Sequence, residues 1–428
     1  MRPGRIVLIL TIILLVATAA CSVVYLTGAY ESRAVMRESG EDTSSAAGQP
    51  TPQPAGSAGQ AGSVTGTAIG ITNQAITIPG QTPGITGQAI ATSTRQAISG
   101  DTGEPELRLI AVGDIMLGRG VGMRLKKAGD YGLAFRKVSD LLKQGDVTFA
   151  NLESPITAST HSLDKKRKIV LKGDPASVEA LTGAGIDVVS LANNHMMDYY
   201  EKGLFDTIDI LDKNDILHMG SGKNIDDARK PAIIEKNGIK IGFLAYSDMA
   251  ELVFAGDPYL KYSAEKDKSG VLPRKYETIK EDVDKLRGQV DILAVSLHWG
   301  VEESFTIPPE QVEFAHKLID DGVDVILGHH PHQFQGIEMY KGKPIIYSMG
   351  NFLFDQNDTE NMESFIMDIR YKGNRLESFT AIPVRILDKS YVEIQTGAAA
   401  SNILERETKL CSKLGTVPET VSDTLVFK

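Results

Sequence analysis

The apolar positions of this chain form one long run near the N-terminus and a series of short runs after residue 106. Residues 6–26 are almost wholly apolar. At a rise of about 1.5 Å per residue, a helix of that length spans roughly 30 Å, the thickness of the hydrocarbon core of a membrane. This first run therefore predicts a membrane-spanning helix.

The short runs are rich in Val, Ile and Leu and are separated by segments with helical periodicity. Strands are expected at residues 107–112, 147–151, 186–191, 239–246, 292–297, 323–327 and 345–349. Helices are expected at residues 134–143, 175–184, 203–213, 276–286 and 309–321. Alternating strands and helices predict an α/β domain with largely parallel pairing, and uninterrupted apolar runs are typical of strands buried on both faces.

Residues 1–31 allow three interpretations. Arg2 and Arg5 precede the apolar run and the next basic residue is Arg33, so the positive-inside rule leaves the N-terminus in the cytoplasm. An uncleaved signal anchor is favoured over a lipoprotein signal with lipid on Cys21, because the apolar run continues past Cys21. A cleaved signal peptide is the third interpretation. All three place the main domain outside the cytoplasm.

Residues 32–105 predict a flexible linker. No charged residue occurs from residue 43 to residue 94, and Gly, Ala, Thr, Gln, Ile, Pro and Ser make up this stretch almost entirely. Such a segment buries too little bulky apolar surface to offset the entropy of ordering its backbone. A domain over residues 106–392 follows. Residues 393–428 are expected to form a helical extension packed on that domain, with an amphipathic helix at 398–414.

The composition argues against two classes of protein. The formal net charge is −10 and the isoelectric point is about 5.4, so the long-range field repels nucleic acid and other polyanions. The two cysteines, Cys21 and Cys411, are too few for a fold built on disulfides. Cys411 is expected to be a small buried hydrophobic residue.

Polar side chains follow the expected strands at the points where the strands end. They are Asp114, Glu153, Asn194 with His195, His298, and the stretch His329-His330-Pro331-His332. The carboxyl ends of parallel strands meet at one edge of a sheet, and α/β proteins bind ligands there. Imidazole, carboxylate and amide ligands together suit Mn, Fe or Zn. Two such ions, about 3.5–4 Å apart, can activate a water and neutralise charge on a phosphoryl group.

Each of these residues also has an ordinary structural explanation. Asp114 after a strand is typical of a helix cap or a turn, and His298 beside Trp299 suits a packed core. His330 and His332 are harder to explain in this way, because two imidazoles two positions apart on an extended loop suit metal chelation. The joint occurrence of these residues favours a metal centre.

Six stretches carry a resemblance to a known family. They are GDIMLGR at 113–119, NLESP at 151–155, SLANNH at 190–195, SLHWG at 296–300, GHHPH at 328–332 and IYSMGNF at 346–352. Over residues 107–355 the chain resembles the capsule-synthesis CapA family, the poly-γ-glutamate synthesis proteins, within the calcineurin-like metallophosphoesterase superfamily. The resemblance does not cover the apolar run or the linker.

The resemblance implies a four-layer α/β/β/α sandwich of the metallo-dependent phosphatase type with a metal centre at one end. By position, Asp114 and His332 would bind the first metal, and Glu153 stands where the superfamily has a bridging aspartate. The second metal would take Asn194, His298 and His330. His195 would face the substrate as an acid or as a charge stabiliser.

Four further residues are candidates for supporting the site, and the chain departs from the superfamily pattern at Met116 and Tyr200 as well as at Glu153. Arg119, Asp198, His329 and Asn351 would contact substrate or support the ligands from behind, with Arg119 suited to clamping an anionic group. Met116 stands where the superfamily has a histidine, which leaves the first metal one ligand fewer. Tyr200 stands where the closer family usually has glycine.

The sequence thus predicts a CapA-like protein in the cell membrane, with its main domain extracytoplasmic, acting in synthesis, export or attachment of a poly-γ-glutamate-type capsule or surface polymer. One or two divalent transition-metal ions would serve its site. Two alternatives are a metal-dependent phosphoesterase on cell-surface phosphoesters and a non-catalytic polymer-binding scaffold of a membrane complex. The expected partners are an anionic polymer or phosphoester substrate, integral membrane capsule-synthesis proteins and the membrane itself, and no nucleic acid.

Overall fold

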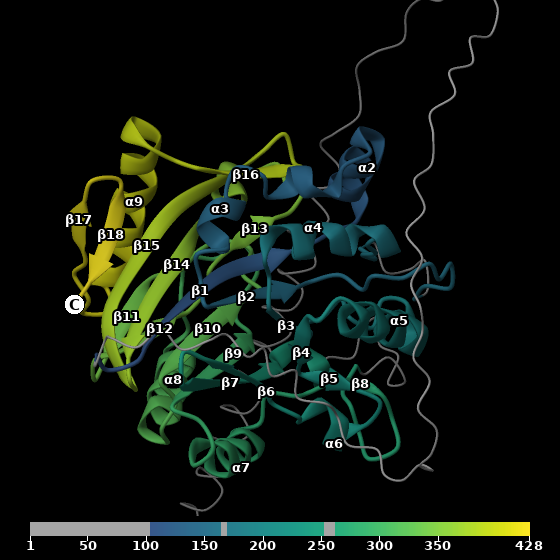
Figure 1. The fold of residues 1–428 in the computed structure, drawn as a ribbon, viewed down its shortest axis with the longest axis horizontal. Helices are drawn as coiled ribbons and strands as arrows, with labels where there is room; N and C mark the ends of the chain where they lie inside the picture. Colours follow the sequence, from purple (N-terminus) through teal and green to yellow (C-terminus); the bar gives the residue numbers. More distant parts are fainter. Residues whose placement is uncertain (1–102, 164–168, 252–261) are drawn as a thin grey trace, which may run out of the picture. The chain divides into compact units, whose positions relative to one another are not determined.

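The computed structural model describes residues 103–163, 169–251 and 262–428, all within one compact unit of the chain (Figure 1). The predicted membrane segment at 1–31 and nearly all of the linker predicted at 32–105 lie outside the described residues. Among the described helices, none is long and apolar enough to cross a membrane.

A ten-stranded sheet forms one half of the described domain. Its strand order is β17 (Glu419–Val421), β18 (Thr424–Phe427), β15 (Arg375–Leu387), β14 (Glu363–Lys372), β1 (Glu106–Ile115), β2 (Val147–Leu152), β3 (Val188–Ser190) and β4 (Leu217–Met219). In addition, β13 (Asn351–Leu353) pairs with β1, and β16 (Tyr391–Ile394) pairs with β15. Pairing is parallel among β13, β1, β2, β3 and β4, and antiparallel from β1 through β14 to the C-terminal strands.

A six-stranded sheet forms the other half. Its order is β11 (Ile337–Tyr340), β12 (Lys343–Ile346), β10 (Val325–His329), β9 (Ile292–His298), β7 (Ile239–Ser247) and β6 (Ala232–Lys236). The four central strands run parallel and the two outer strands antiparallel. A two-stranded sheet of β5 (Ser221–Gly222) and β8 (Gly270–Val271) lies beside them.

The helices connect these strands. They are α2 (Arg119–Ala128), α3 (Ser139–Leu142), α4 (Val178–Ala184), α5 (Tyr200–Lys213), α6 (Ile225–Ala228), α7 (Tyr276–Arg287), α8 (Pro309–Asp320) and α9 (Gly397–Ser412). The described residues also form the 3-10 turns η1 (Tyr131–Ala134), η2 (Pro175–Ser177), η3 (Asp248–Glu251) and η5 (Thr359–Met362). The local sequence of α8 explains where it forms: Pro309 takes the first position, and Ala315, Leu318 and Ile319 recur on one buried face.

The six-stranded sheet is buried on both faces because its side chains alternate between two cores. Along β9, Ile292 and Ala294 belong to the core shared with the ten-stranded sheet, whereas Leu293 and Val295 belong to a second core with α7 and α8. Phe149 of the ten-stranded sheet stacks on Phe243 of the six-stranded sheet, with ring centroids 5.7 Å apart. Figure 1 shows α2, α3 and α4 on the side of the ten-stranded sheet that faces away from the six-stranded sheet. The protein is therefore a mixed α/β fold with two facing sheets between helices.

All seven expected strands are present, with ends shifted by up to three residues. The helix expected at 134–143 is confirmed only in part: the chain forms the 3-10 turn η1, a turn at 135–138 and the single-turn helix α3. Phe135, directly after η1, stacks on Phe352 of β13 with ring centroids 5.4 Å apart. The C-terminal helix is α9, and it is followed by β17 and β18, which join the ten-stranded sheet.

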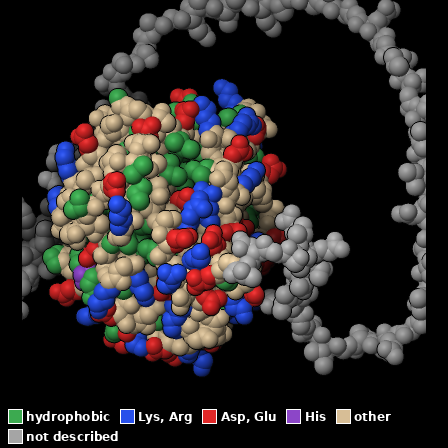
Figure 2. All heavy atoms as spheres, turned by 60° about the vertical axis from the view of Figure 1, so that its left-hand side comes forward, with side chains coloured by type: hydrophobic (Ala, Val, Ile, Leu, Met, Phe, Trp, Pro, Cys, Tyr) green, Lys and Arg blue, Asp and Glu red, His purple; other side chains and the backbone are tan. Residues whose placement is uncertain are grey.

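Charged side chains are mixed on the described surface. Figure 2 shows one face, on which basic and acidic side chains are interspersed and no basic area stands apart from acidic ones. Pairs on the exposed side of α7, such as Lys285 with Glu281, are of this mixed kind. Exposed ion pairs stabilise a fold by only about 0–1 kcal/mol, so burial of apolar surface holds the layers together.

One buried acid makes the stability of this fold depend on pH. Burial raises the pKa of Glu407 on α9 from 4.5 to about 8, although Cys411 donates a hydrogen bond to it. A carboxyl whose pKa is raised on folding stabilises the fold fully below pH 4.5, and this contribution is lost as the pH rises to about 8. We therefore expect Glu407→Gln to be more stable than the wild type at pH 8 by about 2–4 kcal/mol.

Urea unfolding of the protein at pH 5, 6.5 and 8 measures this effect. Glu405→Gln is the matched control, because Glu405 lies on the same helix and is exposed. Equal pH dependence of the wild type and Glu407→Gln would contradict the assignment.

Candidate metal centre

The ends of parallel strands from both sheets bring the predicted site residues together. Asp114 of β1 lies in register with Asn151 of β2, and His298 of β9 lies in register with His329 of β10. Glu153 directly follows β2. Two glycines allow this convergence: a Cβ on Gly113 would lie 1.9 Å from the Gly350 carbonyl oxygen, and one on Gly328 would lie 1.9 Å from the Tyr347 carbonyl oxygen.

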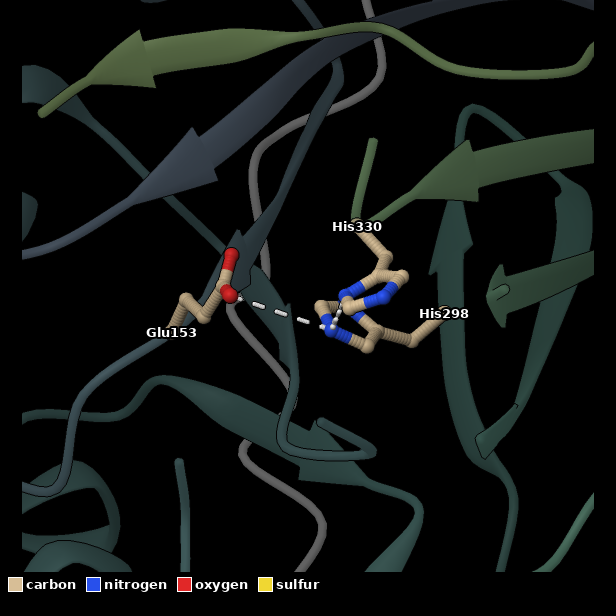
Figure 3. Close-up of side chains that lie close together, drawn as sticks. All are labelled: Glu153, His298 and His330. Carbon is tan, nitrogen blue, oxygen red and sulfur yellow. Dashed lines mark hydrogen bonds and ion pairs between the residues drawn. The ribbon is translucent and has the colours of Figure 1, made fainter. Parts of the chain in front are cut away.

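One group of donor atoms lies between Glu153, His298 and His330, all buried (Figure 3). His298 Nε2 lies 3.1 Å from His330 Nδ1 and 3.8 Å from Glu153 Oε1. The Asn194 Oδ1 atom lies 3.0 Å from the same His298 nitrogen. Figure 3 shows the carboxylate of Glu153 pointing toward the two imidazoles. These four side chains can therefore surround one cation.

A second group consists of Asp114, Glu153 and His332, also buried. His332 Nε2 lies 4.0 Å from Glu153 Oε1. Glu153 belongs to both groups, so it is placed where a carboxylate would bridge two ions.

The carboxylate of Glu153 is fully buried, and neither of its oxygens has a hydrogen-bond partner among the described residues. Burial first, and then the carboxylates of Asp114 and Glu302, raise the pKa of Glu153 well above its usual range. A buried carboxylate without donors is costly unless a cation compensates it. Glu153 therefore fits a ligand of a divalent ion.

The histidines of the first group are suited to be ligands because they stay neutral. Burial, together with the neighbouring imidazoles, lowers the pKa of His298 well below its usual value. Burial likewise lowers the pKa of His330 to about 4, although Glu302 acts in the opposite direction. A neutral imidazole keeps one nitrogen lone pair for a cation. Neutral imidazoles with carboxylate and amide oxygens suit Mn, Fe or Zn.

The tautomer of His332 follows from its neighbours. The amide nitrogen of Asn351 donates to the carbonyl oxygen of Asn361 and to Gln356 Oε1, which leaves Asn351 Oδ1 as an acceptor. His332 Nδ1 lies 2.9 Å from that oxygen and must donate to it. The lone pair of His332 is therefore on Nε2, the nitrogen nearer Glu153. Asn351 thus supports His332 from behind.

His195 forms a pair with Asp198. Its Nδ1 lies 2.7 Å from Asp198 Oδ2, and the backbone N–H of Leu171 donates to the same oxygen. The His195 side chain is buried apart from a small exposed part. The carboxylate fixes the imidazole with Nδ1 protonated when neutral.

Arg119 and Met116 have partners of their own. The guanidinium of Arg119 is partly exposed and lies 3.2 Å from Asp355 Oδ1. The backbone N–H of Gly118 donates to the sulfur of Met116, and Met116 is fully buried. The structure therefore places Arg119 in an ion pair at the start of α2, and the sulfur of Met116 against the backbone of Gly118.

Several residues that sequence reasoning missed also shape this site. Asn151 donates to Asp114 Oδ1 at 2.9 Å, and Asn193 donates to Asn151 Oδ1 at 3.2 Å. Glu302 Oε1 lies 4.0 Å from His330 Nε2. All three residues belong to or adjoin the stretches quoted for the resemblance, and this position in the sequence is the feature by which they could have been predicted. His330 and His332 also have φ angles of +97° and +60°, a conformation that costs about 1–3 kcal/mol each and is concentrated at functional sites.

The sequence of this chain is similar to those of known proteins. The family described as "Bacterial capsule synthesis protein PGA_cap" matches residues 108–356. The capsule biosynthesis protein CapA of Bacillus anthracis is 31% identical over 315 residues, 72% of this chain and 74% of that protein. The PGA biosynthesis protein CapA of Bacillus subtilis is 31% identical over 297 residues, 69% of this chain and 76% of that protein. The chain therefore belongs to the bacterial capsule synthesis protein family PGA_cap, as the resemblance predicted.

Solved structures are more distant. A putative 5'-nucleotidase from Staphylococcus aureus, in complex with alpha-ketoglutarate, is 14% identical, covers 72% of this chain and 58% of its own, and has a TM-score of 0.41. A likeness at this level carries no argument about the present chain.

The burial of Glu153 predicts that Glu153→Gln has a small effect without metal and a large one with metal. Because burial raises the pKa of Glu153 and so disfavours its ionised form in chelated protein, Glu153→Gln should change the free energy of unfolding there by less than about 1 kcal/mol. With Mn²⁺ at 100 times its dissociation constant, the wild type should gain about 2.7 kcal/mol per site, and the variant should gain much less.

Thermal unfolding in chelator and in Mn²⁺ measures both quantities, and Glu310→Gln on the exposed side of α8 is the control. An equal Mn²⁺ response of wild type and Glu153→Gln would contradict the role of Glu153 as a ligand.

Proposed function

We propose that this protein is a membrane-anchored, extracytoplasmic member of the family that acts, through a metal-dependent site, in synthesis, export or attachment of a poly-γ-glutamate-type capsule or surface polymer. The names of the two Bacillus relatives supply the biological process, capsule biosynthesis in one and PGA biosynthesis in the other. The family membership of this chain supports the transfer of that process to it.

The metal-dependent part of the proposal rests on the carboxylate of Glu153, which has no hydrogen-bond partner among the described residues. It belongs to two donor groups at once, one with His298 and His330 and one with Asp114 and His332. The order of helix, sheet, sheet and helix layers also fits the metallo-dependent phosphatase type of sandwich that the resemblance implies.

In this proposal Asn194, His298 and His330 would hold one divalent ion, Asp114 and His332 would hold the other, and Glu153 would serve both. Bound ions of this kind supply charge neutralisation and an acidified water. The imidazolium form of His195, held at Nδ1 by Asp198, would donate its Nε2 proton to the leaving group. Burial of the ligands excludes bulk water and strengthens each of these interactions. A phosphoryl group or a γ-glutamyl amide are the two candidate reacting groups.

The metal content of the purified protein tests the proposal directly. By elemental mass spectrometry we expect two transition-metal ions per wild-type chain, and loss of both in the double variant His330→Ala, His332→Ala. The matched control is His218→Ala, His316→Ala, because these two histidines pair with Asp212 and Glu338 and belong to neither donor group. Circular dichroism confirms that the variants are folded.

Other outcomes separate the alternatives. One ion per chain would indicate a centre without the Asp114-side cation and would count against a two-metal phosphoesterase. No ion after growth with Mn, Fe and Zn would overturn the metal-dependent proposal and favour a polymer-binding scaffold. With two ions bound, turnover of γ-glutamyl peptides or of phosphoesters that is lost in His298→Ala identifies the reacting group.

The membrane attachment is tested at Cys21. A signal anchor holds the protein through the apolar run itself, so Cys21→Ser should remain in the membrane fraction after ultracentrifugation. Deletion of residues 1–31 should release the protein into the soluble fraction and is the positive control. Release of Cys21→Ser would contradict the anchor and indicate a lipid attached at this cysteine. Cleavage by protease added to spheroplasts reports whether the domain is outside the cytoplasm.

A further inference from the structure

His329 occupies a buried place behind the donor groups. It is the last residue of β10 and is fully buried, as is Asp114. Its Nδ1 lies 2.8 Å from Asp114 Oδ1, and its ring packs against Phe149 with centroids 5.7 Å apart. The alternation of β10 points His329 toward the ten-stranded sheet, on the same face as Val325 and Leu327.

The hydrogen bonding of His329 excludes it as a ligand through Nδ1. Both oxygens of the Asp114 carboxylate already accept hydrogen bonds from N–H groups, Oδ1 from Asn151 and Oδ2 from the backbone of His330. His329 Nδ1 must therefore be the donor, and it has no lone pair to offer. Its Nε2 is buried and has no hydrogen-bond partner among the described residues. Neither donor group includes His329.

The carboxylate of Asp114 receives hydrogen bonds at both oxygens. Oδ1 accepts from His329 and from Asn151 at 2.9 Å, and Oδ2 accepts from the backbone N–H of His330 at 3.2 Å. Asn151 also lies 3.5 Å from His298 Nδ1, so its loss would disturb both donor groups. His329, by contrast, acts on the Asp114 side and can be changed without altering a ligand.

We infer that His329 is a positioning residue, which holds the Asp114 carboxylate in the rotation needed to bind the cation of the Asp114–Glu153–His332 group. The inference rests on the proposed function, because it presumes that this group binds a cation. Removal of a residue that orients a metal ligand commonly lowers metal affinity by about 10–100-fold. The loss should affect one of the two ions and leave the ion at His298 and His330 in place.

Two amide variants separate positioning from packing. The amide nitrogen of asparagine stands where His Nδ1 stands, whereas that of glutamine stands near His Nε2. We expect His329→Asn to retain affinity within about threefold, and His329→Gln to lose about 10–100-fold at one site. Equilibrium dialysis of the full-length protein against Mn²⁺ measures both affinities. Equal loss in the two variants, or equal weakening of both ions, would overturn the inference.

Measuring His329→Gln in a protein that also carries Asp114→Asn shows which of the two ions is affected. In that background His329→Gln should cause no further loss of Mn²⁺ affinity, because the carboxylate that it orients is gone. A further loss of tenfold or more would show that His329 acts elsewhere.

Absence of Mn²⁺ binding in the wild type would overturn the proposed function and the inference with it, and a metal-free measurement then shows only whether His329 and Asp114 are coupled. The urea midpoint of the double variant His329→Gln, Asp114→Asn should shift by less than the sum of the two single shifts. Additive shifts would overturn the inference as well.

Discussion

A buried carboxylate without hydrogen-bond donors is the constraint around which this domain is arranged. Glu153 is enclosed at the meeting point of the two sheets, and both of its oxygens lack a hydrogen-bond partner among the described residues. An isolated charge in such a place costs several kcal/mol, and the neighbouring carboxylates of Asp114, Glu302 and Asp198 increase the cost. The imidazoles of His298 and His330 are kept neutral by burial, so they offer lone pairs but no positive charge to compensate it. The arrangement is stable in an ionised form when a cation completes it.

The architecture explains why these groups meet. Along β9 and β10 the two-residue period assigns His298 and His329 to the face that packs on the ten-stranded sheet, where β1 and β2 end at Asp114 and Glu153. The close backbone approaches at Gly113 and Gly328 permit no side chain. The left-handed conformations of His330 and His332 add strain, which the surrounding packed strands sustain. The packing of the two sheets thus determines both the fold and the positions of the site residues.

Sequence analysis predicted the parts of this structure that are encoded locally. Buried parallel strands are continuous apolar runs, and the polar residues after them stand out, so the strands and the donor side chains were found together. The long antiparallel strands β14 and β15 were missed, because β15 alternates between buried and partly exposed positions and has no apolar run. The stacking of Phe135 on Phe352 joins residues more than 200 positions apart in the chain, and no local pattern contains it. The same limit applies to Asp114, whose partners His329 and Asn151 come from two other strands.

The two sides of Glu153 are not equivalent, and the difference has a physical origin. On one side four side chains can donate to a cation, and two of them are imidazoles kept neutral by burial. On the other side the Asp114 carboxylate already accepts three hydrogen bonds, which disperse its charge. Met116 engages its sulfur with the backbone of Gly118 and so offers nothing in place of a histidine. We therefore expect the cation at His298 and His330 to be held more tightly. The cation beside Asp114 depends more on the orientation of a single carboxylate, so the geometry that His329 imposes matters most where the ligands are fewest.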